Sequence, residues 1–175
     1  MKTRDDFGKT LNGGYGVELG VSQGRFSKQL LQSSNLKMLF SIDRWSEEVG
    51  VPHDYEQYLE AKDTLREFGN RSVVIMLPFA EAVHLFQDEC FDFIYIDGMA
   101  STGLENGKTL YDWWPKLKNG GLFAGHDYHE HFPILIEEVD KFVEKHNLDL
   151  RLTKEVHEDN SVRDQVYPSW YFTKQ

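Results

Sequence analysis

The chain has 175 residues, 40% of them hydrophobic and 27% charged, a composition that excludes a disordered protein and fits one globular domain over residues 1–175. The formal net charge of −10 repels phosphate groups, so nucleic acid is not expected as a partner. No apolar run approaches the roughly 20 residues that cross a bilayer, and an apolar leader is not expected. Cys90 is the single cysteine, which suits a reducing compartment. The sequence therefore predicts a cytoplasmic protein without a membrane partner.

Short apolar runs alternate along the chain with segments of helical periodicity, which predicts a parallel sheet wound with helices. Strands are expected over residues 15–19, 37–42, 72–77, 91–96 and 122–125. Helices are expected over 25–31, 53–68 and 134–146. A further helix is expected around Leu110, and Pro115 ends it. Two more strands, over 149–154 and 168–173, are expected at the far edge. The predicted fold class is α/β, a Rossmann-like doubly wound sheet of about seven strands, mostly parallel with an antiparallel edge strand.

A glycine turn follows the first predicted strand. Gly20 and Gly24 bracket this turn, and Asp43 ends the second strand 19 positions after Gly24. Glycines let a backbone approach a bound nucleoside, and a later carboxylate accepts hydrogen bonds from two ribose hydroxyls. A dinucleotide fingerprint would have a glycine where Ser22 stands. The spacing therefore favours an adenosyl ligand without a pyrophosphate.

Carboxylates stand at four of the five predicted parallel strand ends. They are Glu18, Asp43, Asp97 and Asp127, the last preceded by His126. In an open α/β sheet, ligands bind outside the carboxyl ends of the strands, where the strand order reverses. This edge is the predicted site. The loops over residues 44–54, 99–106 and 128–133 are expected to cover it.

Four ordered motifs carry a resemblance to a known family. They read VELGVSQG at 17–24, SIDRW at 41–45, FIYIDG at 93–98, and WWPKLKNGG from 113 running into GHDY at 125–128. On these motifs the chain resembles class I S-adenosylmethionine-dependent methyltransferases. Within that family it is similar to the small-molecule O-methyltransferase branch that includes macrocin-type sugar methylases.

The resemblance implies a set of cofactor-binding residues. Glu18 and the turn from Gly20 to Gly24 would hold the methionine end of S-adenosyl-L-methionine. Asp43 would accept hydrogen bonds from the ribose hydroxyls, and Trp45 and Phe79 would pack near the adenine.

The resemblance also implies catalytic and metal-binding residues. Asp97, His126 and Asp127 match the positions that hold a metal in metal-dependent members, so Mg²⁺ or another divalent cation is a candidate cofactor. Asp97 and His126 are the candidate catalytic residues, and His129 and His131 remain alternatives to His126 as the base because imidazole titrates near neutral pH.

The predicted reaction is methyl transfer from S-adenosylmethionine to an oxygen of a small molecule, a sugar or a phenol. The expected partners are this acceptor and, because an exposed sheet edge or helix face would suit it, a second copy of the chain. One alternative is a non-catalytic adenosyl-binding protein, since Ala100 stands where the catechol branch has a lysine base. A nicotinamide-dependent oxidoreductase is a second alternative, which the glycine spacing disfavours.

Overall fold

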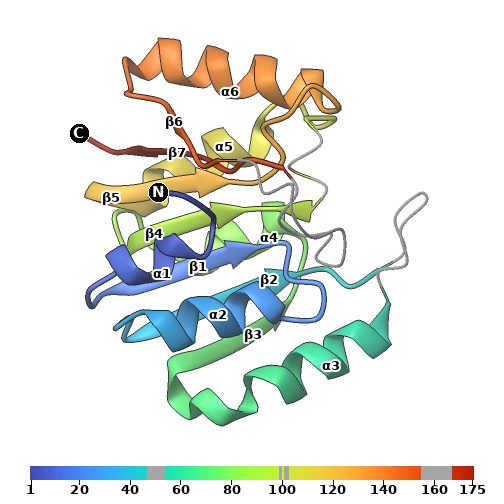
Figure 1. Cartoon of the computed structure of the whole chain (residues 1–175). Coiled ribbons are helices and arrows are strands. Elements are labelled where there is room, and N and C mark those ends of the chain that lie inside the picture. Colours follow the sequence, from blue (N-terminus) through green and yellow to red (C-terminus); the bar gives the residue numbers. More distant parts are fainter. Residues whose placement is uncertain (47–53, 99, 101–102, 155–166) are drawn as a thin grey trace.

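The computed structural model describes residues 1–46, 54–98, 100, 103–154 and 167–175. Its centre is a seven-stranded sheet in the order β3-β2-β1-β4-β5-β7-β6 (Figure 1). The strands are β1 Tyr15–Leu19, β2 Met38–Asp43, β3 Ser72–Met76, β4 Phe91–Ile96, β5 Leu117–Gly125, β6 Arg151–Leu152 and β7 Trp170–Thr173. Strands β1 to β5 are parallel, β7 runs antiparallel to β5, and β6 pairs antiparallel with β7. The predicted fold class is confirmed.

Helices cover both faces of the sheet. They are α1 Asp6–Thr10, α2 Arg25–Ser33, α3 Tyr55–Leu65, α4 Phe79–Ala82, α5 Lys108–Trp113 and α6 Pro133–His146, with a 3₁₀ segment at Arg66–Arg71 after α3. Helices α1 and α2 lie in front of the sheet in Figure 1 and bury Phe7 and Phe26 against it. Helices α5 and α6 pack on the other face through Trp113 and Phe142.

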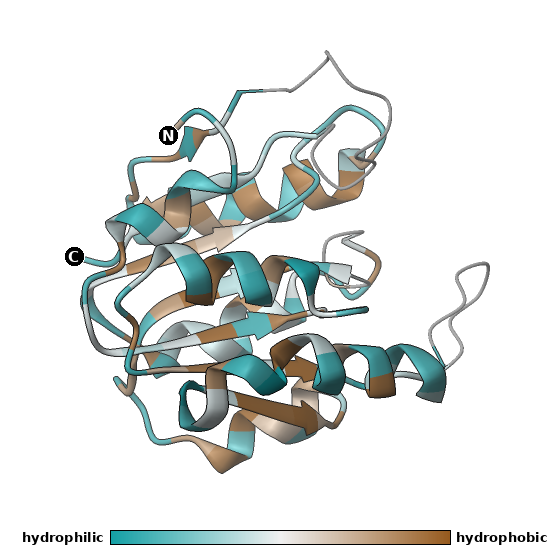
Figure 2. Ribbon diagram, turned by 60° about the horizontal axis from the view of Figure 1, so that its bottom comes forward, coloured by the Kyte–Doolittle hydropathy of each residue, from teal (hydrophilic) through white to brown (hydrophobic). Residues whose placement is uncertain are grey.

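The central strand β4 is buried on both faces. Phe93 and Tyr95 belong to the core beneath α1 and α2, whereas Ile94 and Ile96 belong to the core beneath α5 and α6. All four side chains are at most 1% exposed. Because alternate residues of a strand point to opposite faces, a strand with two cores needs an unbroken apolar run. The helices in front of this sheet alternate hydrophilic and hydrophobic residues along their length (Figure 2).

Strand β5 begins five residues before the predicted start. Phe91 pairs with Leu117, and Phe93 pairs with Leu122, so the pairing is irregular between them. Gly120 lies in that irregular stretch with a φ of +81°. Glycine at this position lets the strand bulge and continue.

Helix α1 was not predicted, and it ties the N-terminal segment to the sheet. The Met1 amino group donates a hydrogen bond to the Tyr171 hydroxyl at 3.1 Å. The Lys154 N–H donates to the Lys2 carbonyl at 2.8 Å. Phe7 is fully buried and meets the Tyr171 ring edge-on, with 5.5 Å between ring centroids. The first residues are thereby fixed across the sheet.

The predicted helix at 53–68 corresponds to α3, with residue 53 outside the described part of the chain. Among the described residues, no helix has the length and apolar character that a membrane crossing needs.

Candidate active site

The carboxylate of Asp43 holds the glycine turn in place. Its Oδ2 atom accepts hydrogen bonds from the backbone N–H of Val21 at 2.8 Å and of Ser22 at 3.0 Å. Its Oδ1 atom accepts from the N–H of Trp45 at 3.2 Å. Asp43 is only 6% exposed, so these charge-assisted bonds stabilise the loops after β1 and β2 together.

The two glycines of the turn serve different contacts. Gly20 has a φ of +92°, and a Cβ added there would lie 2.6 Å from the carbonyl carbon of Asp97, so the ends of β1 and β4 touch through backbone. Gly24 has a φ of +77° and precedes α2, and its added Cβ would lie 3.3 Å from Ala61 and Leu65 of α3. Gly20 therefore shapes the edge of the sheet, while Gly24 lets α2 and α3 pack closely.

A cavity of about 180 Å³ opens at this edge. Its lining comes from the ends of β1 to β4 and the start of α5: Gly20, Asp43, Arg44, Pro78, Phe79, Ala80, Gly98, Ala100, Glu105, Lys108, Thr109 and Asp112. Three of the predicted cofactor-binding residues, Gly20, Asp43 and Phe79, thus share one cavity. Parts of the loops expected to cover it, residues 47–53, 99 and 101–102, lie outside the described residues.

Glu18 points into the protein interior and is 1% exposed. Its Oε2 atom accepts a hydrogen bond from the Ser27 hydroxyl, which also lies 2.9 Å from the Ser41 hydroxyl. Burial raises the pKa of Glu18 to about 8, although the Ser27 hydrogen bond acts in the opposite direction. Glu18 is absent from the cavity lining, and its contact with the cofactor remains a prediction.

Trp45 also lies outside the cavity lining, which its neighbour Arg44 joins. The indole is 4% exposed and packs edge-on against Tyr58 of α3, with ring centroids 5.0 Å apart. Its Nε1–H donates to the Ser22 carbonyl at 2.8 Å, and its backbone has a φ of +41°. These contacts fix Trp45 to the glycine turn, and its packing near adenine remains a prediction.

Asp97, His126 and Asp127 come together at the ends of β4 and β5. One potential ligand atom from each residue lies within 4.8 Å of the other two. His126 Nδ1 lies 2.7 Å from Asp127 Oδ1 and 3.9 Å from Asp97 Oδ1. Asp97 Oδ1 accepts a hydrogen bond from the Gly98 N–H at 2.7 Å, and Asp127 has a left-handed backbone with a φ of +62°. The structure thus gathers the three predicted metal and catalytic residues.

Burial and neighbouring charges shift the pKa values in this group. Burial raises the pKa of Asp97, the charge of His126 opposes this, and the charge of Asp127 adds to it. Burial alone would lower the pKa of His126, but the charges of Asp97 and Asp127 outweigh it and raise that pKa above 6.5. His126 Nε2 is buried and has no hydrogen-bond partner among the described residues.

A family model described as a methyltransferase domain matches residues 17–128. The chain belongs to this methyltransferase domain family. The matched stretch begins in β1 and ends just after β5, so it contains the cavity lining and the group formed by Asp97, His126 and Asp127. The resemblance to methyltransferases is thereby confirmed at the level of the family, and the macrocin-type branch remains a prediction.

Solved structures with the same fold include methyltransferases named for different substrates. An rRNA methylase from Streptococcus thermophilus is 12% identical, with a TM-score of 0.68 over 98% of this chain and 93% of that one. A precorrin-6y C5,15-methyltransferase from Geobacter metallireducens is 13% identical, with a TM-score of 0.69 over 97% and 84%. A SAM-dependent O-methyltransferase from Thermotoga maritima is 15% identical, with a TM-score of 0.67 over 97% and 62%.

These likenesses show that the fold of the methyltransferase is the one used by S-adenosylmethionine-dependent enzymes, and they leave the acceptor open. A search of curated proteins found no match.

Arg4 of the methyltransferase contacts the predicted site residue Asp97, and no sequence pattern indicates this contact. Its Nη1 atom donates to Asp97 Oδ2 at 3.3 Å, and its guanidinium carbon lies 4.7 Å from the centre of the Phe26 ring. The two charged partners are 93 positions apart, and no local motif predicts such a contact. Arg44 and Lys108 of the cavity lining were also missed, although Arg44 directly follows Asp43 in a recognised motif.

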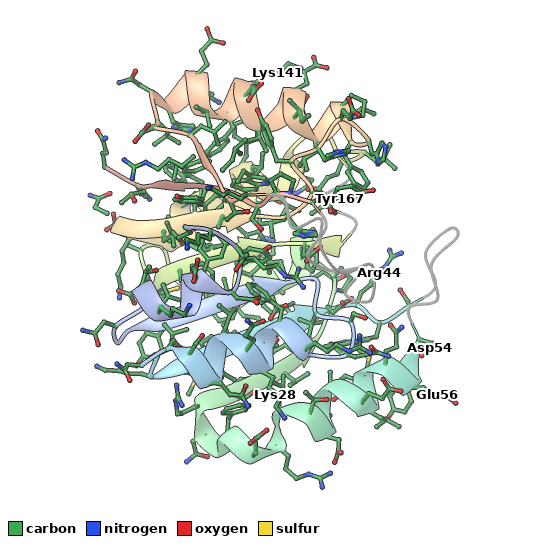
Figure 3. The ribbon with its side chains drawn as sticks, viewed as in Figure 1. Lys28, Arg44, Asp54, Glu56, Lys141 and Tyr167 are labelled. Carbon is green, nitrogen blue, oxygen red and sulfur yellow. The ribbon has the colours of Figure 1, made fainter. Side chains whose placement is uncertain are left out.

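Aromatic side chains gather where the loop after β5 meets Tyr167, which precedes β7. His131 Nδ1 lies 2.8 Å from the Tyr167 hydroxyl, and the His129 ring lies 4.5 Å from both the His131 and the Tyr167 ring centroids. Figure 3 shows Tyr167 and Arg44 on the side of the molecule toward which β1 and β4 point. The two alternative base candidates, His129 and His131, are therefore engaged with Tyr167.

Proposed function

We propose that this methyltransferase moves a methyl group from S-adenosylmethionine to a hydroxyl oxygen of a small molecule such as a sugar or a phenol. The observation that carries the proposal is the His126–Asp127 pair, whose atoms Nδ1 and Oδ1 are 2.7 Å apart. The pair follows β5. The neighbouring strand in the sheet is β4, and the end of β4 leads into Gly98 of the cavity lining. A donor cavity beside an oriented imidazole is the combination that hydroxyl methylation requires.

The cavity supports an adenosyl donor. Asp43 presents a carboxylate to the cavity, where it can accept hydrogen bonds from the ribose hydroxyls in addition to those from the turn. Phe79 and Pro78 give the same cavity an apolar wall for a flat base. A carboxylate for the ribose and an apolar wall for the base are what an adenosyl group requires.

The chemistry assigns His126 the role of general base. The acceptor oxygen attacks the sulfonium methyl carbon, the carbon–sulfur bond breaks with its electrons left on sulfur, and the hydroxyl proton passes to His126 Nε2. Asp127, hydrogen-bonded to Nδ1, holds the ring and stabilises the imidazolium that forms. The buried Nε2 has no described partner, and the acceptor hydroxyl would supply one.

A divalent cation is the second candidate for activating the hydroxyl. Two carboxylates and an imidazole form a donor set that first-row divalent metals accept, whereas Mg²⁺ prefers oxygen ligands. Asp97, His126 and Asp127 would hold such an ion, which would lower the pKa of the acceptor hydroxyl. The contact between His126 Nδ1 and Asp127 leaves Nε2 as the atom that would meet either the acceptor proton or the metal, so the two roles are separated by experiment.

Charge and aromatic content support a small acceptor over a nucleic acid. The acidic side chains of Asp43, Asp97 and Asp127 share the edge, and the whole chain has a net charge of −10, so a polyphosphate backbone would be repelled. The rings of His129 and His131 lie on the loop that follows Asp127, and Tyr167, which precedes β7, packs against them. Together they offer flat surfaces for a sugar or phenol ring.

Methyl-transfer assays with labelled S-adenosylmethionine over phenols, sugars and a short RNA test the proposal. His126→Asn should lower transfer by about 100-fold or more at unchanged cofactor affinity. His84→Asn, at an exposed histidine that is not part of the cavity lining, is the matched control and should retain wild-type transfer. Loss of transfer with EDTA and recovery with a divalent metal would favour the metal over the unaided base.

Two results would contradict the proposal. Tight cofactor binding without transfer to any acceptor would point to a non-catalytic adenosyl-binding protein. Methylation of the RNA alone would place the acceptor in the wrong chemical class.

A further inference from the structure

We propose that Arg4 binds the carboxylate of the cofactor's methionyl group and so makes the site selective for adenosyl ligands that carry an amino acid. The inference rests on the proposed function, because it takes S-adenosylmethionine as the donor. It adds a binding residue that lies before the residues matched by the family model, 17–128.

The position of Arg4 places a cation between the end of β4 and the helix after the glycine turn. Its Nη1 atom lies 3.3 Å from Asp97 Oδ2, and its guanidinium carbon lies 4.7 Å above the ring of Phe26, in the first turn of α2. The side chain is only 10% exposed. A cation held in such a dry position interacts strongly with an anion that reaches it.

The order of the sheet relates Arg4 to the rest of the donor. Strand β1 lies between β2, which ends at Asp43, and β4, which precedes Asp97. A ligand whose ribose is held by Asp43 therefore crosses the end of β1 at Gly20 before it reaches Asp97 and Arg4. The methionyl group is the part of the donor that extends from the ribose in this direction.

The two oxygens of Asp97 separate the donor side from the acceptor side. Oδ2 contacts Arg4, whereas Oδ1 accepts from the Gly98 N–H at 2.7 Å and lies 3.9 Å from His126 Nδ1. Arg4 thus faces the glycine-turn side of this carboxylate, and the proposed base faces the other oxygen. An anionic group of the donor is the ligand that Arg4 is placed to meet.

Charge explains why an arginine is needed there. Asp43 and Asp97 lie at this end of the edge, and a carboxylate added near them would be repelled. The charge of Arg4 acts on Glu18, Asp97 and His126 alike, so it balances this field. The planar guanidinium also matches the geometry of a carboxylate better than a lysine does.

The N-terminal segment holds Arg4 in advance of binding. Asp6 Oδ2 accepts hydrogen bonds from the N–H groups of Lys2 at 2.8 Å and Thr3 at 3.3 Å, which bracket the turn before α1. Phe7 anchors that turn in the core, and the Lys2 carbonyl is tied to Lys154. A side chain ordered before binding loses little further entropy when the ligand arrives.

Calorimetry with two ligands tests the assignment. S-adenosylhomocysteine and its decarboxylated amine differ only in the carboxylate. Wild-type protein should prefer the amino acid by about tenfold or more, because a hydrogen bond to a charged group contributes a factor of that order. Arg4→Gln should abolish this preference while still binding the amine, and Arg4→Lys should reduce the preference without removing it. Arg66→Gln, at a side chain 79% exposed, is the matched control and should keep it.

The results that overturn the inference are distinct from those that overturn the proposed function. An undiminished preference in Arg4→Gln refutes the role of Arg4 and leaves the proposed function standing. Equal loss of both ligands in a folded Arg4→Gln protein also refutes it, because Arg4 would then support the site in general. Failure of wild-type protein to bind either ligand refutes the proposed function itself.

Discussion

Replacement of Glu18 by glutamine tests whether a protonated carboxyl group is buried behind the glycine turn. Glutamine keeps an oxygen that can accept the Ser27 hydrogen bond, and it cannot ionise. The carboxyl of Glu18 is 1% exposed, and burial raises its pKa from 4.5 to about 8. Wild-type protein must therefore bury a charge at alkaline pH, whereas the variant does not.

Proton linkage gives the size and the sign of the effect. Because the pKa is raised in the folded state, the contribution of Glu18 to stability is fully present below pH 4.5 and is lost as pH rises through about 8. A rise from 4.5 to about 8 corresponds to a total loss on the order of 5 kcal/mol. Between pH 6 and pH 8 the free energy of unfolding should fall by about 2 kcal/mol from this group alone.

Urea unfolding followed by tryptophan fluorescence at pH 6, 7 and 8 measures this difference. The stability of Glu18→Gln relative to wild type should increase by about 2 kcal/mol from pH 6 to pH 8. Glu60→Gln, at an exposed position on α3, should run parallel to wild type. Parallel curves for wild type and Glu18→Gln would refute the reasoning, because Glu18 would then be ionised in the folded protein at both pH values.

Three further substitutions test the packing and the hydrogen bonds of the site. Asp43→Asn should weaken S-adenosylhomocysteine binding by about tenfold or more in calorimetry, because a neutral amide replaces the charged acceptor; unchanged affinity would remove Asp43 from the ribose site. Gly20→Ala should lower the melting temperature and abolish that binding, since its Cβ would lie 2.6 Å from the Asp97 carbonyl carbon and its φ is +92°. Normal binding by the Gly20→Ala protein would show that the ends of β1 and β4 do not touch. Phe7→Ala should reduce the free energy of unfolding by about 3–5 kcal/mol in urea titrations, because the ring is fully buried. A cost under about 1 kcal/mol would mean that α1 is not anchored as described.

The strands at the centre of the sheet could be predicted from the sequence. Two of them, β1 and β4, begin and end at the expected residues. Strands β1 and β4 are buried on both faces, and a mostly apolar sequence marks each of them, interrupted by Glu18 in β1 and by Asp92 in β4. The parallel arrangement then places the ends of those strands at one edge. That is why Gly20, Asp43 and Phe79 were correctly expected to lie near one another.

The direction of each strand-end side chain could not be predicted in the same way. Glu18 and Asp43 are both acidic residues at strand ends, yet Glu18 bonds to Ser27 in the interior while Asp43 bonds to the glycine turn and lines the cavity. Trp45 packs on Tyr58, and this contact depends on where α3 lies rather than on the motif around Asp43. These choices are made by tertiary packing.

Contacts distant in sequence account for the rest of the site. Arg4 reaches Asp97 only because α1 folds back on the sheet through Phe7, and a five-residue helix has too little periodicity to be recognised. The early start of β5 depends on the irregular pairing between Phe91 and Phe93, which no local pattern predicts.

The left-handed backbone at the edge of the sheet has a consequence for the engineering of this enzyme. Of the six non-glycine residues with positive φ in the described part of the chain, three, namely Ser22, Trp45 and Asp127, lie on loops that follow the strands of the site. Such residues cost on the order of 1 kcal/mol each, so the edge is not the most stable arrangement that the fold allows. Replacing Asp127 by glycine would relieve the backbone and remove the carboxylate that orients His126. Under the proposed role of His126, thermostability and turnover compete at this edge, and stabilising changes should be sought on the helices away from it.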